Sequence, residues 1–245
     1  DNTKSTALYF ENGGTNAFTI NDFNLTSTNG QKNNLVYVAN GIVNLNGTTN
    51  GQMTITGGKS NIGIYTAASG DPLTNKGNIT ISNSDSSIGI LASGSGTVTN
   101  TGKISATGAS VKALVADNST ITSSGKVDVT GTALSDSDGA VGLVAMNGGS
   151  LTQTGGGDIT VDGSASIGAL GQKGGTVDIT GGTIKATGGA FNTYAQGGTV
   201  KLNGTTINTE QKSLAFYADN IGGTGKINFT GATTANIAGG TDANT

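Results

Sequence analysis

The sequence predicts an all-β protein, a right-handed parallel β-helix (a solenoid) of about nine coils with three short strands in each coil. Three observations support this prediction. A short apolar segment recurs every 23 to 30 residues, two further apolar clusters follow each copy, and glycine-rich corners separate the clusters. Units this small cannot bury their own apolar face, so they are stable only when they stack on their neighbours. Parallel crossovers of this kind are right-handed.

The first strand of each repeat is recognised by its fourth residue, which we call the marker. The clearest copies are Ile62-Gly63-Ile64-Tyr65 and Ile88-Gly89-Ile90-Leu91. All five tyrosines of the chain occupy this one position. In chain order, the markers are Tyr9, Tyr37, Tyr65, Leu91, Leu114, Val144, Leu170, Tyr194 and Tyr217.

The second strand is short, as in Val43-Asn44-Leu45, and in the last repeat only Ile221 suggests it. The third strand is the most regular, and its apolar and polar residues alternate, as in Ile79-Thr80-Ile81. Alternation with a period of two is typical of a strand with one buried face. Pairs such as Thr107-Gly108 then end the strand, because glycine accepts the positive φ of a sharp corner.

The chain shows no linker, so we expect residues 1–245 to form a single β-helix segment of a longer rod. The last third strand is expected at Ile227–Phe229, and residues 233–237 are expected to begin a tenth coil. Repeat length varies where loops are expected to protrude. One such place holds Pro72, the only proline, and the longest link holds Asp136 and Asp138.

The composition argues against several classes of function. All 12 basic residues are lysine, the formal net charge is −3, and His and Cys are absent. Without arginine or a basic patch, nucleic acid is not an expected partner. No apolar run approaches the roughly 18 residues of a membrane-spanning helix. The absence of cysteine excludes a disulfide framework.

Some β-helices are enzymes that act on polysaccharides, and these need a strong base or paired carboxyl groups. This chain has two glutamates, Glu11 and Glu210, and no histidine to activate its many Ser and Thr hydroxyls. Segment 222–227 lacks the aspartate of a calcium-binding nonapeptide repeat, and Asp136-Ser137-Asp138-Gly139 lacks the later ligands of an EF-hand. We therefore predict no catalytic residue, metal or cofactor, with a polysaccharide lyase or glycoside hydrolase as the alternative.

The marker column is the predicted binding surface. By alternation, positions one, three and five of the first strand point inward, as Ile88, Ile90 and Ala92 would. Position two, often glycine as at Gly63, and position four then point outward. A contiguous exposed apolar patch usually indicates an interface, and tyrosine offers a rigid ring with a hydroxyl. The predicted binding residues are Tyr9, Tyr37, Tyr65, Leu91, Leu114, Tyr194 and Tyr217. The alternative is that neighbouring rings only stack on each other, or that a bulge turns the column inward.

Two pairs of segments carry a resemblance to a known family. They are Ser60–Tyr65 with Gly77-Asn78-Ile79-Thr80-Ile81, and Ser86–Leu91 with Gly102-Lys103-Ile104-Ser105. The pattern resembles the passenger domains of large type V autotransporter adhesins, especially the long fusobacterial ones, and it covers the whole chain as a repeat.

That resemblance implies a non-catalytic, extracellular rod on the bacterial cell surface. A C-terminal β-barrel, outside these residues, would anchor it in the outer membrane. The implied function is attachment to host cells or other bacteria through a surface protein or a glycan. The resemblance implies no shared ligand motif, and a spacer that displays a distant binding module is a further alternative.

Overall fold

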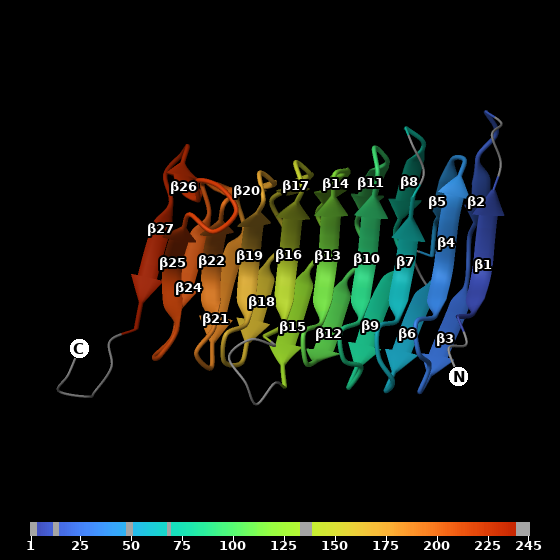
Figure 1. The fold of residues 1–245 in the computed structure, drawn as a ribbon, viewed down its shortest axis with the longest axis horizontal. Helices are drawn as coiled ribbons and strands as arrows, with labels where there is room; N and C mark the ends of the chain where they lie inside the picture. Colours follow the sequence, from blue (N-terminus) through green and yellow to red (C-terminus); the bar gives the residue numbers. More distant parts are fainter. Residues whose placement is uncertain (1–3, 12–14, 48–50, 68–69, 133–138, 239–245) are drawn as a thin grey trace.

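The computed structural model describes residues 4–11, 15–47, 51–67, 70–132 and 139–238, and it confirms the predicted parallel β-helix (Figure 1). In this part of the chain the strands form three parallel sheets of nine strands each, which we call A, B and C. In Figure 1 the chain ascends along sheet A, crosses to the back through sheet B and descends along sheet C as it advances from right to left. The winding is therefore right-handed, as predicted.

Each coil contributes one strand to each sheet. Sheet A consists of β1 (Thr6–Glu11), β4 (Asn34–Asn40), β7 (Ile62–Thr66), β10 (Ile88–Ser93), β13 (Lys112–Asp117), β16 (Val141–Met146), β19 (Ile167–Gln172), β22 (Phe191–Gln196) and β25 (Leu214–Asp219). Sheet B consists of β2 (Phe18–Ile20), β5 (Val43–Leu45), β8 (Pro72–Asn75), β11 (Thr97–Asn100), β14 (Thr120–Ser123), β17 (Ser150–Gln153), β20 (Thr176–Thr180), β23 (Thr199–Asn203) and β26 (Lys226–Phe229). Sheet C consists of β3 (Asn24–Thr28), β6 (Gln52–Thr56), β9 (Asn78–Ser82), β12 (Ile104–Gly108), β15 (Val127–Gly131), β18 (Ile159–Asp162), β21 (Thr183–Thr187), β24 (Thr206–Thr209) and β27 (Thr234–Ile237).

The core is a set of aliphatic columns that run along the axis of the rod. In sheet C, for example, Ile79, Ile104 and Val127 pair in register and all three are buried. Full burial of such a side chain contributes about 1.5–3 kcal/mol. Because each coil adds only one thin layer, this stabilisation is realised only between coils, which is why the repeats have to stack.

A buried amide ladder supports the corner between sheets B and C. The Asn75 side chain donates to Asn100 Oδ1 (2.8 Å) and to the carbonyl of Gly77 (2.9 Å). Asn100 in turn donates to the carbonyl of Gly102 (2.9 Å). Buried polar groups are stable only when they are hydrogen-bonded. The ladder therefore holds successive corners in register.

The last coil differs from its prediction. The segment expected to be its third strand is β26, which pairs with β23 in sheet B, with Ile227 opposite Val200. Residues 234–237, expected to begin a tenth coil, form β27 and complete the ninth coil in sheet C. Ile221, the expected second strand, lies in a turn and is 64% exposed. A long glycine-rich link follows β25, and Ile221 within it was counted as a strand. The next two apolar clusters were therefore each assigned to the strand after the one that they form.

Of the expected protruding loops, only Pro72 can be placed. It is the exposed first residue of β8, opposite Thr97, and is not part of a loop. Proline is tolerated there because the first residue of a strand need not donate a ladder hydrogen bond. Asp136 and Asp138 lie outside the described residues.

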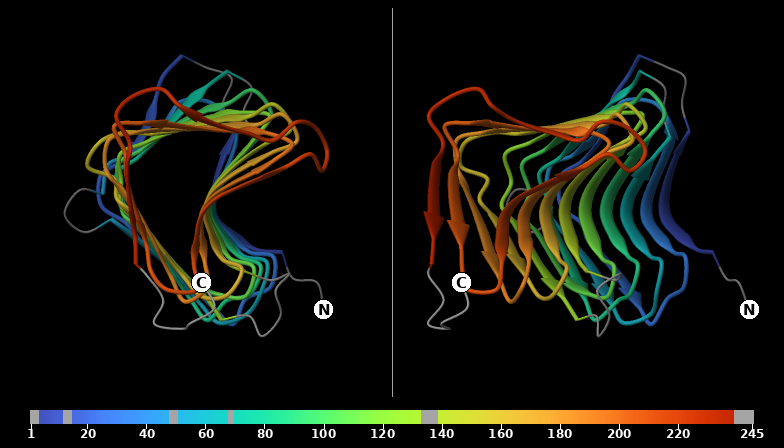
Figure 2. Two further views of the ribbon diagram at one scale, coloured as in Figure 1. Left: turned by 90° about the vertical axis from the view of Figure 1, so that its left-hand side faces the viewer. Right: turned by 60° about the vertical axis from the view of Figure 1, so that its left-hand side comes forward.

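Each strand of sheet A is bent, and the bend changes which side chains face the interior (Figure 2). Positions two and three are both buried, as in Gly89 and Ile90. A Cβ atom added to Gly89 would lie 2.6 Å from the carbonyl oxygen of Ala113 and 3.0 Å from Ile104 Cγ2, so position two points inward. The expectation that position one points inward and position two outward is therefore wrong. Two consecutive inward residues shift the alternation, and position one falls on the outer side with position four.

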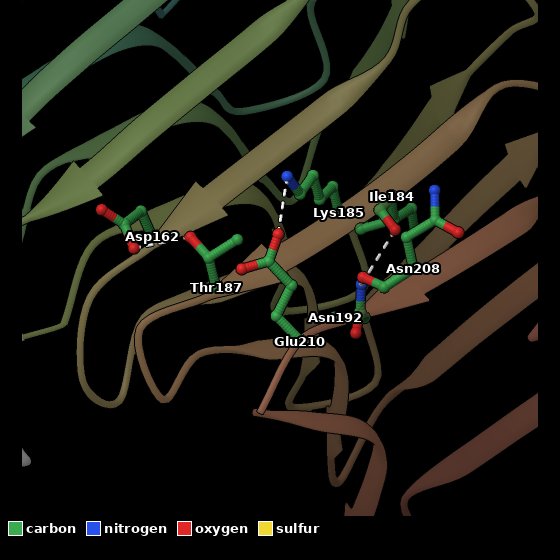
Figure 3. Close-up of polar contacts among 7 residues, drawn as sticks. All are labelled: Asp162, Ile184, Lys185, Thr187, Asn192, Asn208 and Glu210. Atoms are coloured by element: carbon green, nitrogen blue, oxygen red, sulfur yellow. Dashed lines mark hydrogen bonds and ion pairs between the residues drawn. The ribbon is translucent and has the colours of Figure 1, made fainter. Parts of the chain in front are cut away.

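Asn192 shows what the bend brings together in the eighth coil (Figure 3). It occupies position two of β22 and is fully buried. Its Nδ2 donates to the carbonyls of Ile184 (2.9 Å) and Asn208 (3.1 Å) in sheet C, and its Oδ1 accepts from the Thr209 hydroxyl (2.7 Å). Sheets A and C approach each other closely here, and this amide joins them through hydrogen bonds.

Candidate binding groove on sheet A

The outer face of sheet A carries an in-register column of apolar and aromatic side chains at position four, which we call the floor column. Successive members are Cα partners on neighbouring strands, so the column is continuous along the rod. Its members are Tyr9, Tyr37, Tyr65, Leu91, Val115, Val144, Leu170, Tyr194 and Tyr217.

One predicted member of this column is wrong. Leu114 pairs with Ile90 and Leu143 and is fully buried in the main core. Val115 takes its place opposite Leu91 and Val144. The sequence of β13 has Leu and Val next to each other, so an apolar pattern alone could not decide which of the two faced outward.

Two further columns flank the floor. From β10 onward, position one forms an apolar wall with Lys112 as its one polar member. This wall consists of Ile88, Lys112, Val141, Ile167, Phe191 and Leu214. On the other side, Gln172, Gln196 and Asp219 pair in register and form a polar wall. Between these walls lies a groove of about 770 Å³ lined by, among others, Lys112, Leu170, Gln172, Phe191, Tyr194 and Gln196. A volume of this size is typical of ligand sites.

The floor column is exposed less evenly than predicted. Its ends are open, since Tyr9 is 54% and Tyr217 is 43% exposed, but Val144 near the middle is only 1% exposed. Val115, Val141, Val144 and Leu170 form a second apolar cluster, on which Ile88 and Ile167 from position one pack. The position-one side chains cover the middle of the floor, so a continuous exposed stripe is a wrong expectation. What is open is the pair of aromatic ends.

The rings of the floor column contact each other, as the alternative interpretation proposed. Tyr37 and Tyr65 stack with centroids 5.0 Å apart and planes 7° from parallel. Tyr194 and Tyr217 meet edge to face, with centroids at 5.0 Å. Phe191 lies 6.2 Å from Tyr194 and 6.0 Å from Tyr217, which completes an aromatic cluster at one end of the groove. Such contacts stabilise the column and still leave the rings half-exposed.

A chain of polar groups fixes the Tyr194 hydroxyl. It donates to Asp219 Oδ2 (2.5 Å) and accepts from Gln196 Nε2 (3.1 Å), and Gln196 Oε1 accepts from Gln172 Nε2. Burial and the bond to the Asp219 carboxylate raise the pKa of Tyr194 to about 12. The phenol therefore stays protonated and the network keeps one arrangement, because each member orients the next.

Among the described residues, Lys112 is the only charged one on the floor and the apolar wall of the groove, and the carboxylate of the polar wall, Asp219, accepts the hydrogen bond of the Tyr194 hydroxyl. Its Nζ donates to the backbone carbonyl of Ser110 at 3.3 Å. Burial lowers the pKa of this amine, because the surrounding groups remove water from the ammonium. The groove therefore has one partly desolvated cation on the wall opposite the amides.

Three ion pairs lie on the outer face of sheet C. Asp128 contacts Lys103 (2.8 Å) and Lys126 (3.4 Å), and Lys185 contacts Glu210 (2.7 Å; Figure 3). Partial burial acts to raise the pKa of Asp128, but Lys103, Lys126 and a hydrogen bond with Thr160 together outweigh it, so the pKa is lowered. These pairs are half-exposed, so each contributes little to stability.

Within the described ranges there is no group of three or more His, Cys, Asp or Glu side chains placed to hold a metal ion. The same part of the chain has no helix long and apolar enough to cross a membrane.

Several groove residues were missed by the sequence analysis, namely Lys112, Gln172, Phe191, Gln196 and Asp219. A signal for some of them exists: Gln172, Gln196 and Asp219 each follow their marker tyrosine or leucine by two positions. Side chains two residues apart on a strand point to the same face, so these three side chains lie on the same face as the floor column.

The fold and the groove define a class of protein: a right-handed parallel β-helix with an aromatic and amide-lined groove along one sheet. No protein-family model, no curated protein and no solved structure matches this chain.

Proposed function

We propose that this chain is an extracellular rod segment of a bacterial surface adhesin of the autotransporter type, and that it attaches cells by binding rather than by catalysis. The proposal places the protein at the cell surface, held by a β-barrel elsewhere in the same polypeptide, with a host or bacterial surface protein or glycan as its partner. It is supported by the resemblance of its repeats to passenger domains and by the architecture itself.

The observation that carries the proposal is the outer face of sheet A. Half-exposed and exposed rings lie at both ends of one unbroken column, and a groove of about 770 Å³ adjoins the end that carries Tyr194 and Tyr217. Exposed aromatic groups in a concave surface are characteristic of recognition sites. The polar wall adds hydrogen-bonding groups at fixed positions, which supply specificity.

The test is an attachment-competition assay. The purified chain is added to cells of several types, and attachment of bacteria that display the same repeat is measured. We expect the wild-type chain to reduce attachment and the double variant Tyr37→Ser/Tyr65→Ser to reduce it less. The backbone pairing of β4 and β7 does not depend on the two rings, so far-ultraviolet circular dichroism should be unchanged.

A matched control replaces exposed threonines of the other two sheets, Thr80→Ser in sheet C and Thr99→Ser in sheet B. This control should compete like the wild-type chain. Absence of competition by the wild-type chain on every cell type would contradict the proposed function. A double variant that has lost much of its thermal stability and competes less would instead assign the rings a structural role.

A further inference from the structure

We infer that the groove between Lys112 and Tyr217 binds an acidic oligosaccharide, with its sugar rings on the aromatic end and its carboxylate at Lys112. This inference rests on the proposed function and names the chemical class of the partner. Three features of the groove support it, and each is matched to one part of such a ligand.

The first feature is the aromatic end of the groove. Phe191, Tyr194 and Tyr217 present three rings within about 6 Å of one another, as their centroid separations of 5.0, 6.0 and 6.2 Å show. Leu170, only 8% exposed, lies next to Tyr194 on the floor column and supports this surface from below. Sugar rings have one face of C–H groups, and rigid aromatic rings with a polar tip suit such a face.

The second feature is the unused hydrogen-bonding capacity of the polar wall. A glutamine side chain offers two N–H donors and one oxygen acceptor with two lone pairs. Within the network, Gln172 uses one donor, and Gln196 uses one donor and one lone pair. The remaining donors and acceptors lie beside one another, which suits sugar hydroxyls, because each hydroxyl both donates and accepts. The bonds to Tyr194 and Asp219 hold these amides in place before a ligand arrives.

The third feature is charge. Lys112 is three strands from Phe191 in the same column, through Val141 and Ile167. At about 4.8 Å between strands this is roughly 14 Å, the span of a short oligosaccharide. A partly desolvated ammonium gains from an anionic group, and a carboxylate on one sugar of the chain would supply it.

An extended polypeptide is the other occupant to consider. Peptides that add to a sheet do so through unpaired backbone groups at an edge. The groove lies on strands β13 to β25, and β13, β16, β19 and β22 each pair with neighbours on both sides. The face therefore offers side chains and few backbone groups, and this favours a sugar over a peptide strand.

The experiment measures binding of the purified chain to defined probes by isothermal titration calorimetry. The probes are a sialylated trisaccharide, a trisaccharide of hexuronic acid, neutral hexose trisaccharides of matched length, and an acidic peptide. We expect at least one acidic trisaccharide to bind at least tenfold more tightly than its neutral counterpart. Lys112→Met should weaken that binding about tenfold and leave neutral sugars unaffected, the size of effect expected from one charge-assisted hydrogen bond.

Two further variants locate the ligand. Tyr194→Phe keeps the ring and removes the hydroxyl that orients the amides, so it should weaken binding severalfold. Tyr9→Phe, at the opposite end of the same column, is the matched control and should bind like the wild-type chain. Lys112→Met keeps the aliphatic stem in its packing, so its melting temperature should not fall, and weaker binding can then be attributed to the lost charge.

Three results would overturn the inference: no binding to any sugar, equal binding of acidic and neutral probes, or binding of the peptide alone. The proposed function is tested separately by attachment competition before and after enzymatic removal of cell-surface glycans. If the chain still competes for attachment after glycan removal, the adhesin proposal is supported and the oligosaccharide proposal is contradicted. Loss of all competition by the untreated wild-type chain would reject the adhesin proposal even if a purified oligosaccharide binds.

Discussion

The rings of Tyr37 and Tyr65 stack face to face on neighbouring coils, with centroids 5.0 Å apart and planes 7° from parallel. The two residues are Cα partners on β4 and β7, so the stacking follows directly from the register of sheet A. A side chain repeated at one position of a solenoid meets its own copies. The five tyrosines of this chain therefore contribute to coil–coil stability as well as to the surface.

The contribution of this ring pair can be measured by a double-mutant cycle. Tyr37→Leu, Tyr65→Leu and the double variant are compared by chemical denaturation. We expect a coupling free energy of about 0.5–1.5 kcal/mol, because aromatic pairs add this much beyond the area they bury. The distant pair Tyr37→Leu and Tyr217→Leu is the control, and its effects should add to within about 0.5 kcal/mol. Equal coupling in both pairs would argue against stacking.

A comparison of two leucines in sheet A tests the inward placement of position three. Leu114 is fully buried, whereas Leu214 is 44% exposed at position one. Leu114→Ala should lower the free energy of unfolding by about 2–5 kcal/mol, because a cavity forms in the core. Leu214→Ala should lower it by about 1 kcal/mol or less, because most of its surface is already in water. Similar losses in both variants would contradict the assignment of Leu114 to the core.

At position two of β10, Gly89 is predicted to be required by close packing and not by backbone conformation. In Gly89→Ala the new methyl group would lie 2.6 Å from the carbonyl oxygen of Ala113. The backbone of β10 or that of β13 would therefore have to move. We expect a loss of about 1–3 kcal/mol in thermal or chemical unfolding. Gly155→Ala is the control, since its methyl group would be 3.7 Å from the nearest heavy atom, the carbonyl oxygen of Thr180. If Gly89→Ala were as stable as this control, the inward direction of position two would be wrong.

The buried amide ladder should be sensitive to loss of one member. Asn100→Leu would leave one N–H of the Asn75 amide and the carbonyl of Gly102 without the partner that Asn100 provides, although Asn75 keeps its bond to Gly77; each such unpaired group costs about 1–3 kcal/mol when buried. The neighbouring residue Thr99 faces outward on the same strand, so Thr99→Ala should change stability little. Urea denaturation of the two variants gives the comparison. If Asn100→Leu left the free energy of unfolding unchanged, this corner would be held by packing and not by hydrogen bonds.

The phenol network predicts a pH dependence at the alkaline end. The pKa of Tyr194 is raised from its ordinary value of 10.0 to about 12 in the folded chain. A raised pKa contributes stability that is fully present below the unfolded value and is lost as pH rises through the folded value. We expect this contribution to disappear between pH 10 and 12. Tyr194→Phe should remove it.

This dependence is checked by measuring the melting temperature of both proteins against pH, together with the ultraviolet absorbance of tyrosinate. The quantity to compare is the difference between the wild-type and Tyr194→Phe profiles, because it isolates the Tyr194 phenol. Identical pH profiles for the two proteins would contradict the network.

Repeat and alternation were sufficient to predict the architecture. In sheet C, apolar residues such as Ile79 and Ile104 alternate with polar ones, and the structure places both in the interior, as expected. The tyrosines all occupy one column, also as expected. These features depend on local sequence and on the requirement that like coils stack, so they can be predicted from the sequence alone.

Other features could not be read in this way. Leu114 and Val115 are both apolar, and only pairing with β10 and β16 decides which of them faces the core. The bend at position two depends on how closely sheet A approaches Ile104 in sheet C, which no local pattern records. The same bend makes the groove, because it brings positions one and four to the same side.

The repeat pattern was enough to predict stacked three-stranded coils with one tyrosine-rich column, because units this small bury their periodic apolar residues by stacking. Which residues surround that column follows from the three-dimensional packing. Lys112, Phe191, Gln196 and Asp219 come from three coils, through β13, β22 and β25, and their proximity depends on inter-coil register and on the bend in sheet A. Both arise from packing between segments that are distant in the chain.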